Sequence, residues 1–129
     1  MVNRAIAVII TDDNDRILLA RRGQKSRSEF GKWENPGGKI EPKESAEEAA
    51  KREIKEELGV QVNLLETLYT DVFGEWQVTV FKGKLIGEPH IQESDFISEI
   101  RWFNHNQLAT VDLTSYTRAD FIRLGWIKE

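Results

Sequence analysis

Three glutamates lie close together in the sequence, at Glu53, Glu56 and Glu57. On an α-helix these i, i+3 and i+4 positions are neighbours, with Cβ atoms about 5–6 Å apart. Three clustered carboxylates repel one another, and their pKa values rise unless a positive charge lies between them. Hard cations such as Mg²⁺ and Mn²⁺ take oxygen ligands and need neither His nor Cys. The spacing indicates a divalent metal site, and surface ion pairs with Arg52 or Lys55 are the alternative.

The helix that must carry these acids is predicted over residues 46–58. Ser45 begins a Ser-x-x-Glu capping box, and Gly59 stands where a left-handed residue would end the helix. The apolar stripe of this helix also contains Glu53 and Glu57. A helix that needed its acids only for solubility would place them with its lysines. The pattern therefore turns these two carboxylates toward the body of the protein.

A loop rich in turn residues precedes this helix, and residues 33–40 read Trp-Glu-Asn-Pro-Gly-Gly-Lys-Ile. Glycine there lets the backbone come close to a ligand. Elsewhere, apolar and β-branched runs between turn residues predict strands. Strands are expected at 5–10, 17–20, 60–72, 76–86 and 100–102, with a second helix from 113 to 124. This order predicts an α/β or α+β sandwich with a mixed sheet between helices.

The composition limits the kind of protein. The chain has 129 residues, the size of one domain, and has no cysteine, so neither a disulfide framework nor a thiolate metal site is expected. The net charge of -4 argues against a protein that coats nucleic acid, although a small phosphorylated ligand remains compatible with it. The first apolar run is too short for a secretory signal or a membrane span. We expect a cytoplasmic protein without a membrane partner.

The acids and glycines fall into one extended pattern, Gly38-x5-Glu44-x7-Arg52-Glu53-Ile54-x-Glu56-Glu57-x-Gly59-Val60. This pattern resembles the box of the Nudix hydrolase superfamily, and most closely that of its small MutT-like members. The resemblance extends to Leu19-Ala20-Arg21-Arg22, to Trp33-x-x-Pro-Gly-Gly and to Glu99-x-x-Trp102, so it covers most of the chain. It implies one Nudix domain over residues 1–129, an α/β/α sandwich with a mixed central sheet. It also implies hydrolysis of a nucleoside diphosphate linked to another group.

The resemblance implies roles for the box residues. Glu53, Glu56 and Glu57 would hold one or more Mg²⁺ ions, with Mn²⁺ as the alternative metal, helped by the carbonyl of Gly38. Arg52 would orient these carboxylates, and Glu44 would connect the loop to the helix. The metal would neutralise the pyrophosphate and acidify a bound water.

A further acid from a later loop is also implied, as an extra metal ligand or as the general base. Glu99 is the expected residue, and Glu93 and Asp95 are its rivals. Either Glu53 or Glu99 would take the proton from the attacking water.

Substrate contacts are expected from five residues. Arg22 aligns with a phosphate-contacting position of MutT-like enzymes, and a solvated basic loop is the alternative. Asn35 stands where those enzymes usually carry Leu or Phe, so it would hydrogen-bond a base or lie in a turn. Trp33 and Trp76, together with Phe73, are candidates for stacking on a base, with core packing as the alternative.

The resemblance implies a small nucleotide as the substrate, and the signatures of the family's subgroups bear on its class. The signatures of ADP-ribose, NADH and coenzyme A hydrolases are missing, which favours a nucleoside triphosphate cleaved to the monophosphate and pyrophosphate. An ADP-ribose or nucleotide-sugar pyrophosphatase is the alternative within the same chemistry. A nucleotide sensor without catalysis is the alternative from another class. The protein would work as a monomer or a homodimer.

Overall fold

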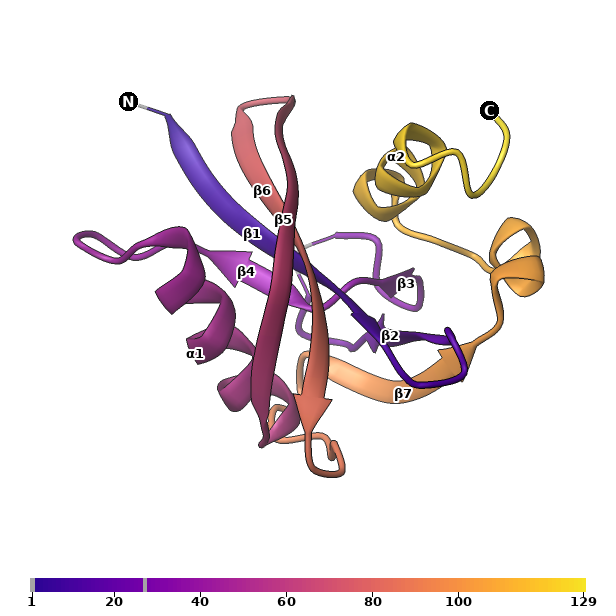
Figure 1. The fold of residues 1–129 in the computed structure, drawn as a ribbon, viewed down its shortest axis with the longest axis horizontal. Helices are drawn as coiled ribbons and strands as arrows, with labels where there is room; N and C mark the ends of the chain where they lie inside the picture. Colours follow the sequence, from indigo (N-terminus) through magenta and orange to yellow (C-terminus); the bar gives the residue numbers. More distant parts are fainter. Residues whose placement is uncertain (1, 27) are drawn as a thin grey trace.

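One mixed sheet and two helices form the frame of the protein (Figure 1). The computed structural model describes residues 2–26 and 28–129. The strands are β1 (Asn3–Thr11), β2 (Ile17–Arg22), β3 (Trp33–Glu34), β4 (Gly37–Lys39), β5 (Gln61–Phe73), β6 (Trp76–Ile86) and β7 (Ile97–Phe103). The helices are α1 (Ala46–Leu58), a 3-10 helix at His105–Thr110 and α2 (Ser115–Arg123).

The sheet is built around β1, in the order β3-β2-β1-β6-β5, with β4 paired to β1 and β7 paired to β2. β1 and β6 run parallel, in a register that joins Asn3 to Trp76 and Ile10 to Gly83. The other pairings are antiparallel. The mixed sheet expected from the sequence is therefore confirmed.

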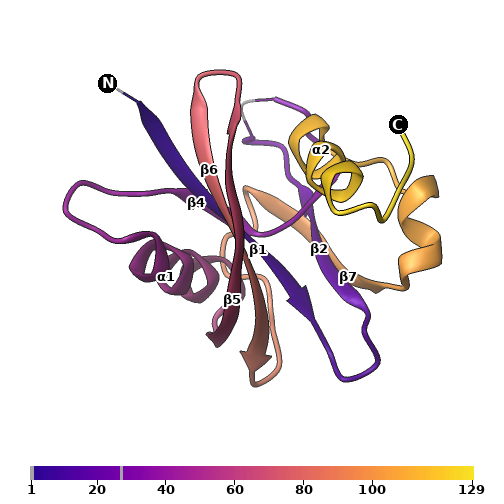
Figure 2. The same cartoon turned by 45° about the horizontal axis from the view of Figure 1, so that its top comes forward.

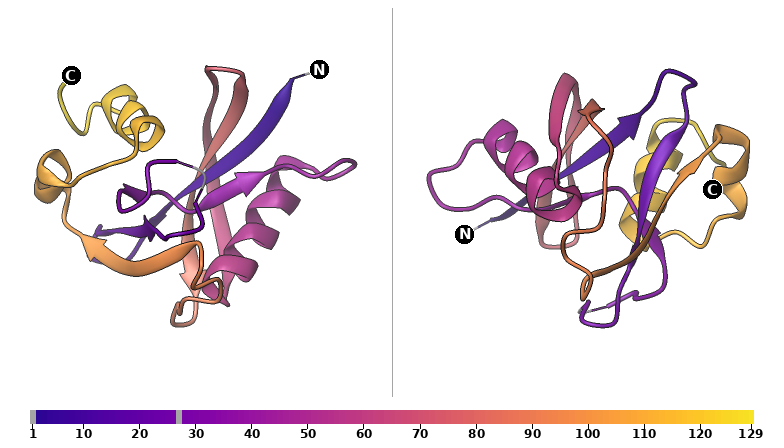
Figure 3. Two further views of the ribbon diagram at one scale, coloured as in Figure 1. Left: turned by 180° about the vertical axis from the view of Figure 1, so that it is seen from behind. Right: turned by 90° about the horizontal axis from the view of Figure 1, so that it is seen from below.

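The two helices lie on opposite sides of the strands, α1 on one side and α2 on the other (Figures 2 and 3). Because side chains alternate along a strand, β1 supplies residues to both cores. Ile6, Val8 and Ile10 pack in the core that contains Ile54 of α1. Ile9 packs in the other core, which includes Phe121 of α2. This arrangement is the predicted α/β sandwich.

α1 has the bounds that the sequence predicted. The hydroxyl of Ser45 accepts from the backbone of Glu48, whose carboxylate accepts in return from the backbone N–H of Ser45 at 2.8 Å. Gly59 ends the helix with φ 70°, a conformation that costs glycine little. α2 is shorter than predicted because Thr114 caps it, with its side chain accepting from the backbone of Thr117.

Three short elements were not predicted from the sequence. β3 and β4 lie in the Gly-rich loop, where Gly37 comes so close to β1 that an added Cβ would be 2.2 Å from the carbonyl oxygen of Ile6. The 3-10 helix at His105–Thr110 follows β7. In the part of the chain that the structure describes, the helices are too short or too polar to cross a membrane.

Candidate active site

α1 turns its three central acids in different directions. Glu57 is buried, Glu53 is largely buried, and the Glu56 side chain is 51% exposed. Burial raises the pKa of Glu57, and the nearby charge of Glu53 raises it further. Burial also raises the pKa of Glu53. Two carboxyl groups are therefore held together inside the protein, where a positive charge between them would relieve their repulsion.

Arg52 connects these acids to the preceding loop. Its guanidinium donates two hydrogen bonds to Glu44, at 2.7 and 2.9 Å, and these hold the pKa of Glu44 at about 2. It also donates to Glu53 at 3.0 Å, to Glu56 at 3.2 Å and to the carbonyl of Lys39 at 3.0 Å. The structure thus places Arg52 and Glu44 where they can fix the orientation of the carboxylates.

Gly38 brings the backbone of β4 against Glu53. A Cβ added at Gly38 would lie 2.5 Å from the carboxyl carbon of Glu53. Any other residue here would displace that carboxyl group. The requirement for glycine at this position therefore comes from the acid that it faces.

The expected later acid, Glu99, lies on the face of the sheet opposite the acids of α1. Ile100 and Trp102 of β7 pack on the core beneath α1, so the alternation of the strand turns Glu99 to the opposite face. There Glu99 pairs with Arg101 and lies 3.9 Å from Arg21. The structure does not bring Glu99 to the acids of α1.

Its rival Glu93 lies near those acids. The loop after β6 is bonded to the end of α1, since the backbone N–H of His90 donates to Leu58 and that of Gln92 donates to Glu57, each at 3.0 Å. The charge of Glu93 contributes to the raised pKa of Glu57. Of the three candidates, Glu93 is therefore the one whose charge acts on the acids of α1, while Asp95 pairs with Lys25.

A divalent metal fits these residues. Oε2 of Glu57 is buried and has no hydrogen-bond partner among residues 2–26 and 28–129, and an unpartnered buried oxygen is costly unless a ligand satisfies it. The surrounding donors are carboxylate oxygens, which Mg²⁺ and Mn²⁺ prefer. Within the same described residues, no three acid or imidazole side chains converge as a ready-made metal cluster. In this structure the guanidinium of Arg52 forms ion pairs with Glu53 and Glu56.

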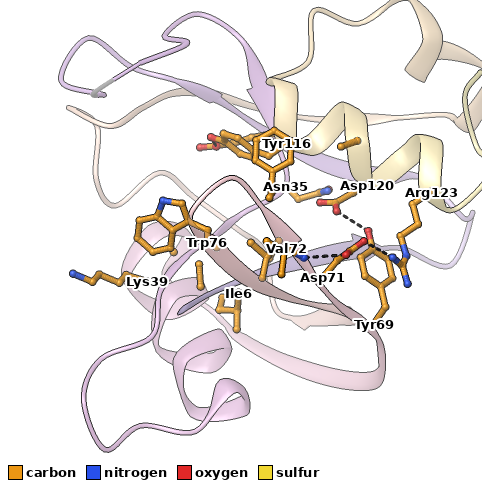
Figure 4. Close-up of a pocket in the computed structure, with 18 of the residues that line it drawn as sticks. Ile6, Asn35, Lys39, Tyr69, Asp71, Val72, Trp76, Tyr116, Asp120 and Arg123 are labelled. Carbon is orange, nitrogen blue, oxygen red and sulfur yellow. Dashed lines mark hydrogen bonds and ion pairs between the residues drawn. The ribbon is translucent and has the colours of Figure 1, made fainter. Parts of the chain in front are cut away.

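A cavity of about 370 Å³ opens on the other side of Gly38, between β1, the β5–β6 hairpin and α2 (Figure 4). This volume is in the range of small-molecule sites. Phe73, Trp76 and Tyr116 line it, with Phe73 and Tyr116 edge to face at 6.3 Å. Two of the three predicted stacking residues, Phe73 and Trp76, are thus at the cavity.

Trp33 lies elsewhere. Its ring packs edge to face on Phe103 at 5.2 Å, beneath the guanidinium of Arg101. Trp33 therefore packs in the core on the α2 side. Core packing was the alternative to base stacking for this residue.

Arg22 lines the cavity and is held by an acid that the sequence reading missed. Its guanidinium donates to both oxygens of Glu34, at 3.0 and 3.1 Å, and to the hydroxyl of Tyr116 at 2.9 Å. Burial raises the pKa of Glu34, whose charge also reaches Glu57. Glu34 therefore lines the cavity and also acts on the pKa of Glu57 in α1. Glu34 stands between two predicted substrate-contacting residues, Trp33 and Asn35, and this position could have marked it as a site residue.

Asn35 and Asp120 form the α2 side of the same cavity (Figure 4). Asn35 is buried, and its backbone N–H donates to Thr117 of α2 at 3.2 Å. The Asp120 carboxylate accepts from the hydroxyl of Tyr69 at 2.6 Å. The sequence reading included Asn35 but missed Tyr69, Tyr116 and Asp120, because no short motif marks β5 or α2.

Comparison with known proteins agrees with this geometry. The pattern of the NUDIX domain matches residues 1–124. A Caenorhabditis elegans protein named as a nudix hydrolase is 35% identical over 124 residues; the match covers 93% of this chain but only 33% of that protein, so the chain spans about a third of its length. The CTP pyrophosphohydrolase of Escherichia coli is 38% identical over 94 residues, 66% of this chain and 68% of that protein.

A solved structure extends the likeness to the fold. The crystal structure of a MutT NUDIX hydrolase from Burkholderia pseudomallei has a TM-score of 0.75 and 34% identity, covering 91% of this chain and 93% of that one. The chain belongs to the Nudix hydrolase family.

Proposed function

We propose that this protein hydrolyses a nucleoside triphosphate to the monophosphate and pyrophosphate, with Mg²⁺ held by Glu53, Glu56 and Glu57. One observation carries the proposal. The buried carboxylate of Glu57, with an unpartnered oxygen, lies beside Glu53. Gly38, which faces Glu53, also lines the cavity of about 370 Å³. Phosphate chemistry and nucleoside binding are thus adjacent.

The chain's own residues divide the work. Arg52 fixes the carboxylates of Glu53 and Glu56 through its bonds to both. Glu93 takes the place that the sequence reading gave to Glu99, as a carboxylate able to accept the proton of the attacking water. When bound, the metal would neutralise the phosphates and lower the pKa of a water.

The cavity would hold the nucleoside. Its walls include the rings of Trp76 and Phe73, which can stack on a base. The CTP pyrophosphohydrolase among the relatives acts on a nucleoside triphosphate by its name, which supports the same substrate class here. Arg22 donates to both oxygens of Glu34. It could therefore contact a phosphate only by giving up one of these hydrogen bonds.

The test compares Glu57→Gln with Lys51→Gln, a change on the exposed side of the same helix. We expect Glu57→Gln to lower kcat/KM with Mg²⁺ by roughly two to four orders of magnitude, since a ligand charge is lost. Mg²⁺ should also raise the unfolding midpoint of the wild type and of Lys51→Gln, but not that of Glu57→Gln. Near-normal turnover in Glu57→Gln, with the Mg²⁺ effect intact, would contradict the proposal.

A further inference from the structure

The side chain of Asn35 is polar and buried, and it destabilises the fold because it forms no hydrogen bond within residues 2–26 and 28–129. Asn35 is 4% exposed, and neither Oδ1 nor Nδ2 has a hydrogen-bond partner among the residues that the structure describes. A buried amide without partners costs stability, whereas an apolar side chain of similar size costs nothing comparable. The usual Leu or Phe of MutT-like enzymes would therefore suit this position better if packing were its only role.

The amide lies at the wall of the nucleoside cavity. Its backbone is bonded to Thr117, and Asp120 lies one turn further along the same face of α2. Figure 4 shows the Asn35 side chain between Tyr116 and Asp120, on the cavity side of the helix. Asn35 and Asp120 thus line the same cavity.

One carboxylate oxygen of Asp120 accepts a hydrogen bond within the protein, and the other can accept one from a ligand. Oδ1 accepts the hydroxyl of Tyr69 at 2.6 Å, which fixes the carboxylate. No described side chain donates to the second oxygen. The neighbouring Asp71 is instead paired with Arg123, whose guanidinium also lies 4.0 Å over the ring of Tyr69.

We propose that Asn35 and Asp120 together read the edge of the nucleobase and select bases that carry an exocyclic amino group. The inference rests on the proposed function for the presence of a nucleotide, and it adds which base the site prefers. The amino N–H donates to the free oxygen of Asp120. The adjacent ring nitrogen then bonds to the amide of Asn35.

The hydrogen-bonding groups of the bases explain the selection. Cytosine and adenine present an amino group beside a ring acceptor, which Nδ2 of Asn35 can satisfy. Guanine presents an amino group beside a ring N–H, which Oδ1 of Asn35 can accept. Uracil and thymine present a carbonyl oxygen where Asp120 offers another oxygen, so the two acceptors would oppose each other without a proton between them.

The test uses pairs of nucleotides that differ at the amino group: CTP against UTP, and GTP against ITP. We expect wild-type kcat/KM to favour the amino member by tenfold or more in at least one pair. Asn35→Leu should lower kcat/KM for that member tenfold or more and raise the unfolding midpoint. Asp120→Asn, which places a donor where the carboxylate was, should reduce or invert the preference for the amino member. This variant keeps the inference testable if Asn35→Leu does not fold.

Asp71→Asn is the matched control, because it removes a carboxylate from the same cavity wall without touching the proposed contacts. The ratio within each pair should stay as in the wild type. A wild type indifferent to the amino group, or a preference that survives both Asn35→Leu and Asp120→Asn, would overturn the inference. So would an Asn35→Leu variant that is less stable and equally selective, since Asn35 would then have a purely structural role.

Binding of the monophosphates CMP, UMP, GMP and IMP, measured by calorimetry, separates this inference from the proposed function. Selective binding of the amino member, lost in Asn35→Leu, would support the inference even in a protein that hydrolyses no triphosphate. Hydrolysis of triphosphates with no amino preference in either assay would leave the proposed function standing and end the inference.

Discussion

Glu57 is buried because its position on α1 falls within the apolar stripe that packs on the sheet. Its carboxylate is kept there at a cost in desolvation and in repulsion from Glu53. The sequence showed this conflict between polarity and position, and it was the strongest sign of chemistry in the chain. The structure places Glu99 away from the acids of α1, and a motif at the end of a strand does not state which face of the sheet its acid takes.

The exchange of Glu99 for Glu93 gives a direct prediction. Glu93→Gln should lower kcat roughly 10²-fold or more, because it removes a carboxylate next to the acids of α1. Glu99→Gln should change kcat by less than about threefold, since that side chain pairs with arginines on the other face. Steady-state kinetics of the two variants decide the point, and equal losses would restore Glu99 to the site.

Asp120 predicts a pH dependence of stability. Burial raises its pKa to about 6 from an ordinary 3.8, so the folded state holds this proton where the unfolded state has lost it. Its contribution to stability is present below about pH 4 and is lost as the pH rises through 6. Relative to Asp120→Asn, the wild type should therefore lose on the order of 2 kcal/mol of unfolding free energy between pH 4 and pH 7. Urea titrations of both proteins at several pH values measure this, and a constant difference would contradict it.

At the scale of elements, the turn from β4 into α1 positions the chemistry. Two adjacent glycines of β4, just before this turn, serve different purposes. Gly37 allows the close pairing of β4 with β1, and Gly38 leaves room for the carboxyl group of Glu53. The first contact is with backbone, which cannot move aside, and the second is with the end of a flexible side chain.

Alanine at each glycine should therefore have a different effect. Gly37→Ala should lower the free energy of unfolding by about 1–3 kcal/mol, because the new Cβ collides with the backbone of Ile6. Gly38→Ala should largely keep stability but lower kcat by tenfold or more, because Glu53 must shift. Chemical unfolding and kinetics of both variants test this, and a matching pair of losses would show that the two glycines have one role.

The same scale shows what the sequence could predict. The bounds of α1 followed from Ser45, Gly59 and the apolar stripe, which are local signals. β3 and β4 were missed, since their pairing depends on strands far away in the chain. A two- or three-residue strand has too few positions to show an alternating pattern.

For the whole molecule, the sheet separates two tasks. α1 lies on one side and α2 on the other (Figure 3), and residues of α2 line the cavity. The cavity depends on contacts such as Tyr69 with Asp120, which are 51 positions apart, and Tyr116 with Glu34, which are 82 apart. One sequence carries no local trace of such pairs, so the acids could be predicted and most of the cavity could not.

The central claim is that the acids of α1 and the cavity under α2 together cleave a nucleoside triphosphate. Product analysis by ³¹P NMR with Mg²⁺ tests it directly, over canonical and oxidised triphosphates, ADP-ribose and nucleotide sugars. The account predicts a monophosphate and pyrophosphate from one or a few triphosphates. Turnover confined to ADP-ribose or a nucleotide sugar, release of single phosphates, or no turnover with either Mg²⁺ or Mn²⁺ would contradict it.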